Sequence, residues 1–127
     1  MKKLSLTLLT FLLFLSPNVV LSETMGDAVE VYLLNQLDDY RGYCIDIKGY
    51  KSKAKISKGL QAHTCYSYQG KIAIDQGFDA LKLIKNKFFL PAFNVCMEAV
   101  SAGVAANIRL SQCRDRKFQE FELDEKG

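Results

Sequence analysis

The fold prediction starts from two segments of the sequence, Cys44-Ile45-Asp46-Ile47 and Leu60-Gln61-Ala62-His63-Thr64-Cys65. Apolar and polar side chains alternate along both, which is the period of half-buried β-strands. If the strands pair, one face carries Tyr43, Ile45, Ile47, Leu60, Ala62 and Thr64, and the other carries Cys44, Asp46, Gln61, His63 and Cys65. We therefore expect an antiparallel hairpin whose second face is polar and open to solvent.

A disulfide between the two segments would fix their register. If Cys44 and Cys65 are bonded and directly opposed, Asp46 lies across from His63, with Gln61 one step further along. Opposed strand positions are about 4.5–5.5 Å apart at Cα, which is within the disulfide range. The prediction is a carboxylate, an imidazole and an amide on one wet face, braced by a covalent bond.

Residues 1–22 have the features of a cleaved signal peptide. Lys2 and Lys3 precede an apolar run over residues 4–15, and small side chains lead up to Ser22. This run, at about 12 residues, is shorter than the ~20 that span a bilayer, so no stable membrane insertion is expected. The mature chain, residues 23–127, is expected to be one secreted or periplasmic domain.

Export favours disulfides over metal ligation for the four cysteines. Four cysteines allow three pairings, and the sequence alone does not choose among them. Their spacing nevertheless favours Cys44 with Cys65 and Cys96 with Cys113. The chain has one histidine and no close pair of cysteines, so neither a metal site nor another cofactor is expected.

The charge balance gives little support for a nucleic-acid partner. Of the 17 basic residues, 15 remain when Lys2 and Lys3 are left out, and the 14 acidic residues nearly balance them. Neutralising several phosphates needs a clustered basic surplus. A local run of lysines does lie between the two strands, at Lys48, Lys51, Lys53, Lys55 and Lys58. A solvated loop is the favoured interpretation of this run, and a polyanion site is the alternative.

The rest of the mature chain is predicted to form short strands and frequent turns. Residues 29–33, 71–75 and 81–89 alternate as strands do, the last of them around an Asn-Lys turn. No segment of the mature chain has a sustained helical period. These features favour an all-β barrel or sandwich.

The pattern of the first hairpin recurs later in the chain. The parallel segments are Cys44-Ile45-Asp46-Ile47 with Cys96-Met97-Glu98-Ala99, residues 59–65 with 107–113, and Gln76-Gly77-Phe78 with Gln119-Glu120-Phe121. We therefore predict two internal repeats, at about residues 40–78 and 92–121, with Phe78 and Phe121 in the core. Such repeats are single supersecondary units that need a neighbour to bury their apolar face.

Each repeat has a cysteine followed by an acidic residue, then a strand that ends in a second cysteine, and then Gln-x-aromatic. Two copies of this pattern resemble the ricin-type β-trefoil lectin domain. The resemblance covers about residues 40–121. It implies an all-β, disulfide-stapled, trefoil-like fold that is incomplete, with about two of three repeats, and a glycan such as a galactose-like sugar as ligand. It places the sugar-binding residues of the first repeat at Asp46, Gln61, His63, Asp75 and Gln76.

The second repeat departs from the family pattern at Glu98, Arg109, Ser111 and Phe118. Its role is therefore expected to be structural, which leaves one functional sugar site in the chain. Because a third repeat is not found, one side of the fold would expose apolar strand edges. Three explanations are open: a trimmed trefoil with an open side, completion by a partner subunit, or an incomplete gene product. A homodimer is the hypothesis that would cover these edges.

The candidate residues also suit a sugar on chemical grounds. A carboxylate such as Asp46 accepts hydrogen bonds from two hydroxyls at once, and an amide beside it both donates and accepts. A flat ring, from His63, Tyr66 or Tyr68, can cover the apolar face of a pyranose. A shallow site of this kind binds weakly, with roughly 4–7 kcal/mol of binding free energy.

The leading functional prediction is secreted, non-catalytic carbohydrate binding through this one site. The alternative is a disulfide-stabilised protein-interaction module, or a toxin targeting subunit, without independent sugar binding. Enzymatic activity is not expected, since the cysteines are predicted to be oxidised and no serine lies in a nucleophile elbow. Asp46 and Asp75 could form a glycosidase-like carboxylate pair, but nothing in the sequence indicates the raised pKa that one of them would need.

Overall fold

The computed structural model describes residues 26–122. The predicted signal peptide, residues 1–22, lies outside the described residues. Residues 26–122 form seven short strands, one α-helix and five 3-10 helices. None of these helices is both long enough and apolar enough to cross a bilayer.

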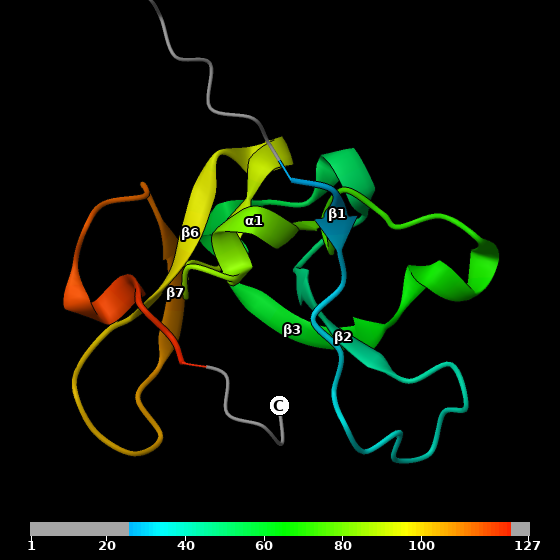
Figure 1. Cartoon of the computed structure of the whole chain (residues 1–127). Helices are drawn as coiled ribbons and strands as arrows, with labels where there is room; N and C mark the ends of the chain where they lie inside the picture. Colours follow the sequence, from blue (N-terminus) through cyan, green and yellow to red (C-terminus); the bar gives the residue numbers. More distant parts are fainter. Residues whose placement is uncertain (1–25, 123–127) are drawn as a thin grey trace, which may run out of the picture.

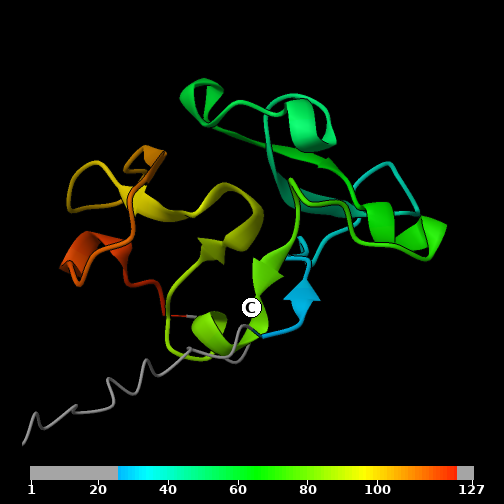
Figure 2. The ribbon, with the colours of Figure 1, turned by 90° about the horizontal axis from the view of Figure 1, so that it is seen from above.

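Most of the regular structure is antiparallel sheet. The strands are β1 (Ala28–Val29), β2 (Tyr43–Ile47), β3 (Leu60–Thr64), β4 (Phe78–Asp79), β5 (Phe89–Leu90), β6 (Val95–Ala99) and β7 (Ile108–Ser111). The helices are α1 (Ala80–Leu83) and the 3-10 helices η1 (Lys51–Lys53), η2 (Ile56–Lys58), η3 (Tyr66–Gln69), η4 (Pro91–Phe93) and η5 (Lys117–Gln119). β1 pairs with β4, β2 with β3, and β5, β6 and β7 form a third sheet. Figures 1 and 2 show the β2–β3 and β6–β7 hairpins in two neighbouring lobes.

Both predicted disulfides are present, Cys44–Cys65 and Cys96–Cys113, and each joins Cα atoms 5.0 Å apart. They occupy the same position in their hairpins. In each, the first cysteine pairs with the residue two positions before the second cysteine, which is His63 in the first hairpin and Ser111 in the second. The prediction of an all-β, disulfide-stapled chain is therefore confirmed, and the two hairpins are built alike.

The predicted register of the first hairpin is wrong by two residues. Cys44 pairs with His63, and Asp46 pairs with Gln61 rather than with His63. The reason is that β3 ends at Thr64, so Cys65 lies beyond the strand, where the chain turns into η3. A shift of two residues keeps each side chain on its predicted face, and so the polar cluster survives the correction.

Other predicted strands differ more. Residues 71–75 form a bend and a turn, and only Val29 of residues 29–33 belongs to a strand, although Tyr32 makes an isolated bridge to Cys44. Residues 81–89 begin in α1 and reach a strand only at Phe89. The Asp79 side chain accepts a hydrogen bond from the backbone N–H of Lys82, and this N-cap favours a helical turn where alternation predicted a strand.

The core joins the two repeats through three aromatic rings. Phe88 packs edge-on against Phe78 at 5.9 Å and against Phe121 at 5.5 Å. The other buried members of this cluster are Ile47, Ala54, Leu90, Val95 and Met97. Phe78 is fully buried, as predicted, and Phe121 is partly buried against the cluster. Because Phe78 is anchored in this way, Gln76 two residues earlier is held at a fixed position behind the first hairpin.

Candidate functional site

Asp46 lies inside a hydrogen-bonded network and not on an open face. Its Oδ1 accepts a hydrogen bond from Gln61 Nε2 at 3.2 Å, and its Oδ2 accepts one from Gln76 Nε2 at 3.0 Å. Asp46 is 1% exposed and Gln76 is fully buried. The prediction of a wet face around Asp46 is therefore wrong, because the turn at residues 73–77 covers that face and brings Gln76 onto it.

Gln76 ties the hairpin to the segment that follows it. Besides binding Asp46, its Nε2 donates to the carbonyl oxygen of Thr64 at 3.0 Å, and its Oε1 accepts from the backbone N–H of Tyr66 at 3.0 Å. Glu30 Oε1 accepts from the same Tyr66 N–H at 2.9 Å. The buried Gln76 and the half-buried Glu30 thus position the start of η3 and the Tyr66 ring.

The Asp46 carboxyl group has a raised pKa. Burial is the main cause, since removing a carboxylate from water disfavours its charged form. The charge of Asp75 raises the pKa further, while the hydrogen bonds from Gln76 and Gln61 and the nearby His63 lower it. No lysine or arginine contacts Asp46 within residues 26–122.

Asp75 is the second buried carboxyl group of the first repeat. It is fully buried, and its Oδ2 accepts a hydrogen bond from the backbone N–H of Lys51 at 2.6 Å. Its Oδ1 makes no hydrogen bond with any described residue. A buried acceptor without a donor costs free energy, and such groups frequently mark a functional site.

A stacked aromatic pair, the exposed His63 and the half-buried Tyr66, lies next to this buried network. His63 and Tyr66 stack with ring centroids 5.6 Å apart and an interplanar angle of 22°. His63 Nδ1 is 3.9 Å from Asp46 Oδ2, and the His63 side chain is 46% exposed. Gln61 is half-buried beside it. Tyr68, which was also considered as a ring for the sugar, packs instead against the Arg41 guanidinium at 5.1 Å.

Tyr66 also forms a wall of a surface hollow of about 370 Å³. The other lining residues are Lys51, Ser52, Gln69, Lys71, Ile72, Ala73 and Ile74. One of these residues, Lys51, also donates its backbone N–H to the buried Asp75. The first repeat therefore presents a ring with an exposed neighbour, an amide and a hollow on one part of the surface.

The second repeat contains the same network with a different charge balance. Gln119 Nε2 donates to Glu98 Oε2 at 2.8 Å and to the Gln112 carbonyl oxygen at 2.9 Å, and Gln119 Oε1 accepts from the Arg114 N–H at 2.7 Å. Arg109 forms an ion pair with Glu98 at 2.6 Å. Gln119 thus makes the same three kinds of hydrogen bond in the second hairpin as Gln76 makes in the first, and Arg109 adds a cation beside the carboxylate.

Glu98 is accordingly held in its charged form. Hydrogen bonds from Ser111, Arg109 and Gln119, in this order of size, lower its pKa to about 2. No ring stacks beside it in place of His63, since Ser111 occupies that position. The carboxylate of the second repeat is therefore fully paired, while the structural role of this repeat stays a prediction.

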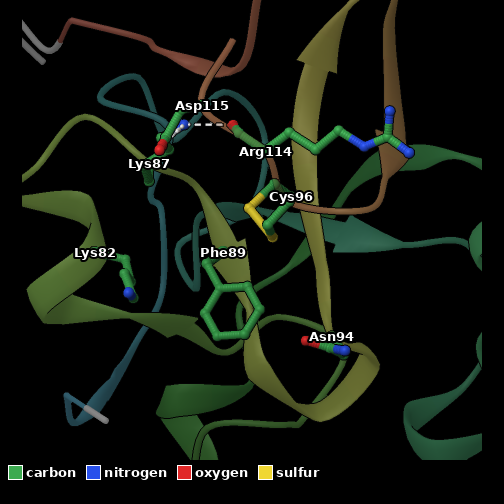
Figure 3. Close-up of a pocket in the computed structure, with 8 residues that line it drawn as sticks. Lys82, Lys87, Phe89, Asn94, Cys96, Arg114 and Asp115 are labelled. Atoms are coloured by element: carbon green, nitrogen blue, oxygen red, sulfur yellow. Dashed lines mark hydrogen bonds and ion pairs between the residues drawn. A yellow bond between two sulfur atoms is a disulfide. The ribbon is translucent and has the colours of Figure 1, made fainter. Parts of the chain in front are cut away.

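A second hollow, of about 350 Å³, lies beside the Cys96–Cys113 disulfide (Figure 3). Its wall includes Phe89, with Lys82 and Asn94 at its sides. Lys87 Nζ donates to the Arg114 carbonyl oxygen at 2.6 Å and lies 3.5 Å from Asp115. The Arg114 guanidinium points away from the ring in this view. The polar groups at this end of the hollow are therefore occupied within the protein.

One cluster of potential metal ligands exists among residues 26–122, formed by Glu30, Cys44 and Cys65. The two sulfur atoms are bonded to each other. A disulfide offers no thiolate, so this cluster does not have the donors that a zinc site requires.

The structure brings together all five residues that the sequence nominated for sugar binding. Only Gln61 and His63 reach the surface, while Asp46, Asp75 and Gln76 are buried behind them. Lys51 and Lys71 at the hollow were not nominated. The signal for Lys51 was its place in the lysine run, but nothing in the sequence indicated that its backbone binds Asp75.

The chain matches no protein-family model, and comparison with curated proteins and with solved structures finds no match. Function is therefore inferred from the residues and their geometry.

Proposed function

We propose that the protein is a non-catalytic carbohydrate-binding protein with a single shallow site on the first repeat. The two hairpins are, in this proposal, two repeats of a ricin-type β-trefoil-like lectin domain. The repeated bonds of Gln76 and Gln119 support this relation between them. The proposal keeps the predicted location of the site but changes which atoms meet the ligand.

The observation that carries the proposal is the stacked pair of His63 and Tyr66 beside a hollow. A pyranose has one face of C–H groups, which packs well on a ring whose edge remains wet. Gln61 next to the pair offers an amide that can donate and accept with the sugar hydroxyls. Buried acceptors hold the Tyr66 backbone, so little side-chain and loop entropy is lost on binding.

Asp46 and Gln76 act as positioning residues in this proposal. Their polar atoms bind one another and the backbone of η3, so they fix the aromatic pair without touching the sugar. Asp75 is different, because its Oδ1 lacks a donor among the described residues. Because Asp75 is fully buried, it does not meet the ligand in this proposal.

Screening on a glycan array, followed by titration of the best glycan, tests the proposal. Tyr66→Ala and His63→Ala should each weaken binding by about tenfold, because each removes a ring contact worth on the order of 1 kcal/mol. Phe118→Ala is the matched control, since it removes a 40% exposed ring from the second repeat. Absence of binding to any glycan, or binding that both first-repeat variants retain in full, would refute the proposal.

Protein-partner binding is a second candidate function, favoured by one observation. The loop that follows β1 exposes Leu34 by 71%, Leu37 by 66% and Tyr40 by 85%. Large apolar side chains gathered on one exposed loop are typical of interaction surfaces. Partner binding that competing sugars do not displace would favour this function over the first.

A further inference from the structure

The hollow beside Tyr66 is bordered by two cations that form no ion pair with a carboxylate in the described chain. Lys51 and Lys71 both line it, and neither forms an ion pair with any residue in 26–122. Lys51 Nζ lies 5.4 Å from the centre of the Tyr66 ring and 5.2 Å from that of Tyr50. Two rings therefore hold this ammonium at the edge of the hollow by cation–π contact.

The Lys51 backbone is held in an unusual conformation at this point. Its φ angle is 48°, in the left-handed region that non-glycine residues rarely adopt and that costs about 1–2 kcal/mol. The bond from its N–H to Asp75 Oδ2 keeps it there. Strained residues of this kind are concentrated at ligand-binding sites.

The rest of the lysine run extends the positive surface away from the hollow. It consists of Lys48, Lys53, Lys55 and Lys58, all exposed, on a loop that η1 and η2 order. Backbone bonds fix this loop, from Lys48 N–H to the Gly59 carbonyl and from Lys55 N–H to the Lys48 carbonyl. Buried Ala54 anchors it to the core. The loop is ordered, and its lysines form no ion pair with any residue in 26–122. These observations favour a polyanion site more strongly than the sequence alone does.

The acidic groups near the hollow lie behind this surface. Asp46 and Asp75 are buried, and Glu30 accepts the N–H groups of Tyr66 and Ser67. Their negative charge would repel an anion that entered deeply. An anionic group is therefore favoured only at the rim, beside the half-buried Lys51 and the exposed Lys71 that line the hollow.

We infer that the sugar bound at this site carries a negative charge, as a carboxylate or a sulfate group. The inference rests on the proposed function and adds the class of ligand to it. The anionic group meets the ammonium groups of Lys51 and Lys71 at the rim of the hollow. The sugar packs against the part of the Tyr66 ring that lines the hollow, since His63 and the Lys51 ammonium already lie over that ring. Lysine suits this role, because its ammonium is a compact charge with three donors on a flexible stem.

Paired glycans that differ only in one acidic group test the inference, with separate pairs for a carboxylate and a sulfate. The acidic member should bind about tenfold more tightly at low salt, since each partly exposed contact contributes up to about 1 kcal/mol. The preference should fall as salt is added, because exposed charges are screened within about 10 Å at 0.1 M. Whichever pair shows the preference identifies the anionic group.

Lys51→Gly provides the decisive variant, because glycine accepts a positive φ and the fold should tolerate it. It should reduce the acidic-over-neutral ratio severalfold, whereas the matched control Lys58→Gln should leave that ratio unchanged. Equal binding of acidic and neutral glycans, or an unchanged ratio in Lys51→Gly, would overturn the inference and leave the proposed function standing. Failure of every glycan to bind would refute both.

Discussion

Asp46 and Glu98 occupy equivalent positions in the two hairpins, and their surroundings differ in the cross-strand partner and in the residue beside it. Both are buried and both accept a hydrogen bond from a buried glutamine that also binds the backbone after the second cysteine. Glu98 is in addition paired with Arg109 at 2.6 Å and bonded to Ser111. The cross-strand partner of Asp46 is the uncharged Gln61, and the residue at the position of Ser111 is His63.

This difference is the basis for proposing a binding site in the first repeat and a structural role for the second. Pairing with a cation lowers the pKa of Glu98 to about 2, whereas burial without a cation raises the pKa of Asp46. In the second repeat the network is closed on itself. Next to the network of the first repeat lie an Asp75 oxygen without a hydrogen-bond donor among the described residues, a stacked aromatic pair, and two lysines that form no ion pair with residues 26–122. The two hairpins thus differ in whether the polar groups at and around their networks are all hydrogen-bonded or ion-paired within the protein.

The two glutamines give the largest expected contrast. Gln76→Ala should lower the free energy of unfolding by about 3 kcal/mol and Gln119→Ala by about 2 kcal/mol, because each leaves buried polar groups unpaired. The loss at Gln76 is larger because Asp46 keeps only the Gln61 bond, whereas Glu98 keeps Arg109 and Ser111. Urea unfolding measures both values.

Gln36→Ala, on an exposed loop, is the control and should change the free energy of unfolding by less than about 0.5 kcal/mol. A loss at Gln119 equal to or greater than the loss at Gln76 would contradict the distinction between the closed and the open network.

The two carboxyl groups should also respond to acid in opposite directions. The pKa of Glu98 is lowered from 4.5 to about 2, so its stabilising contribution is complete above pH 4.5 and is lost as the pH falls toward 2. The pKa of Asp46 is raised above 3.8, so the folded state binds its proton more tightly than the unfolded state does. Its unfavourable contribution is therefore present at neutral pH and is relieved as the pH falls through the folded-state pKa.

Asp46→Asn and Glu98→Gln separate these contributions in a series of urea unfolding curves between pH 7 and pH 2.5. We expect the stability of wild type relative to Asp46→Asn to rise on acidification, and that relative to Glu98→Gln to fall. The change in the free energy of unfolding caused by Asp46→Asn should be the smallest among these substitutions at buried residues, because Gln61 can rotate its amide to keep a bond to asparagine. A constant difference between wild type and Asp46→Asn across this range would contradict the raised pKa.

The hairpins and the favoured pairing of the cysteines were predicted correctly, because strand alternation and cysteine spacing are local patterns. The register was not predictable in the same way. Cys65 lies one residue past the end of β3, and where a strand ends depends on the turn that follows it. The helix α1 was missed because its Asp79 cap overrode an alternating pattern.

The residues of the candidate site lie together as predicted, but the exposure of three of them was predicted wrongly. Asp46 was assigned to a wet face because an aspartate on an alternating strand usually faces water. Its burial depends on Gln76, which lies 30 positions later in the chain and arrives on that face only when Phe78 packs into the core. Lys51 entered the site for a similar reason, since its contact with Asp75 also joins distant segments.

The most direct test of the account is an NMR titration of the isotope-labelled protein with the best glycan from the array. Backbone amide shifts should change most at Lys51, His63 and Tyr66, with no comparable change at Glu98 and Arg109. Shifts centred on the second repeat, or spread equally over both hairpins, would contradict the claim that only the first repeat is a binding site.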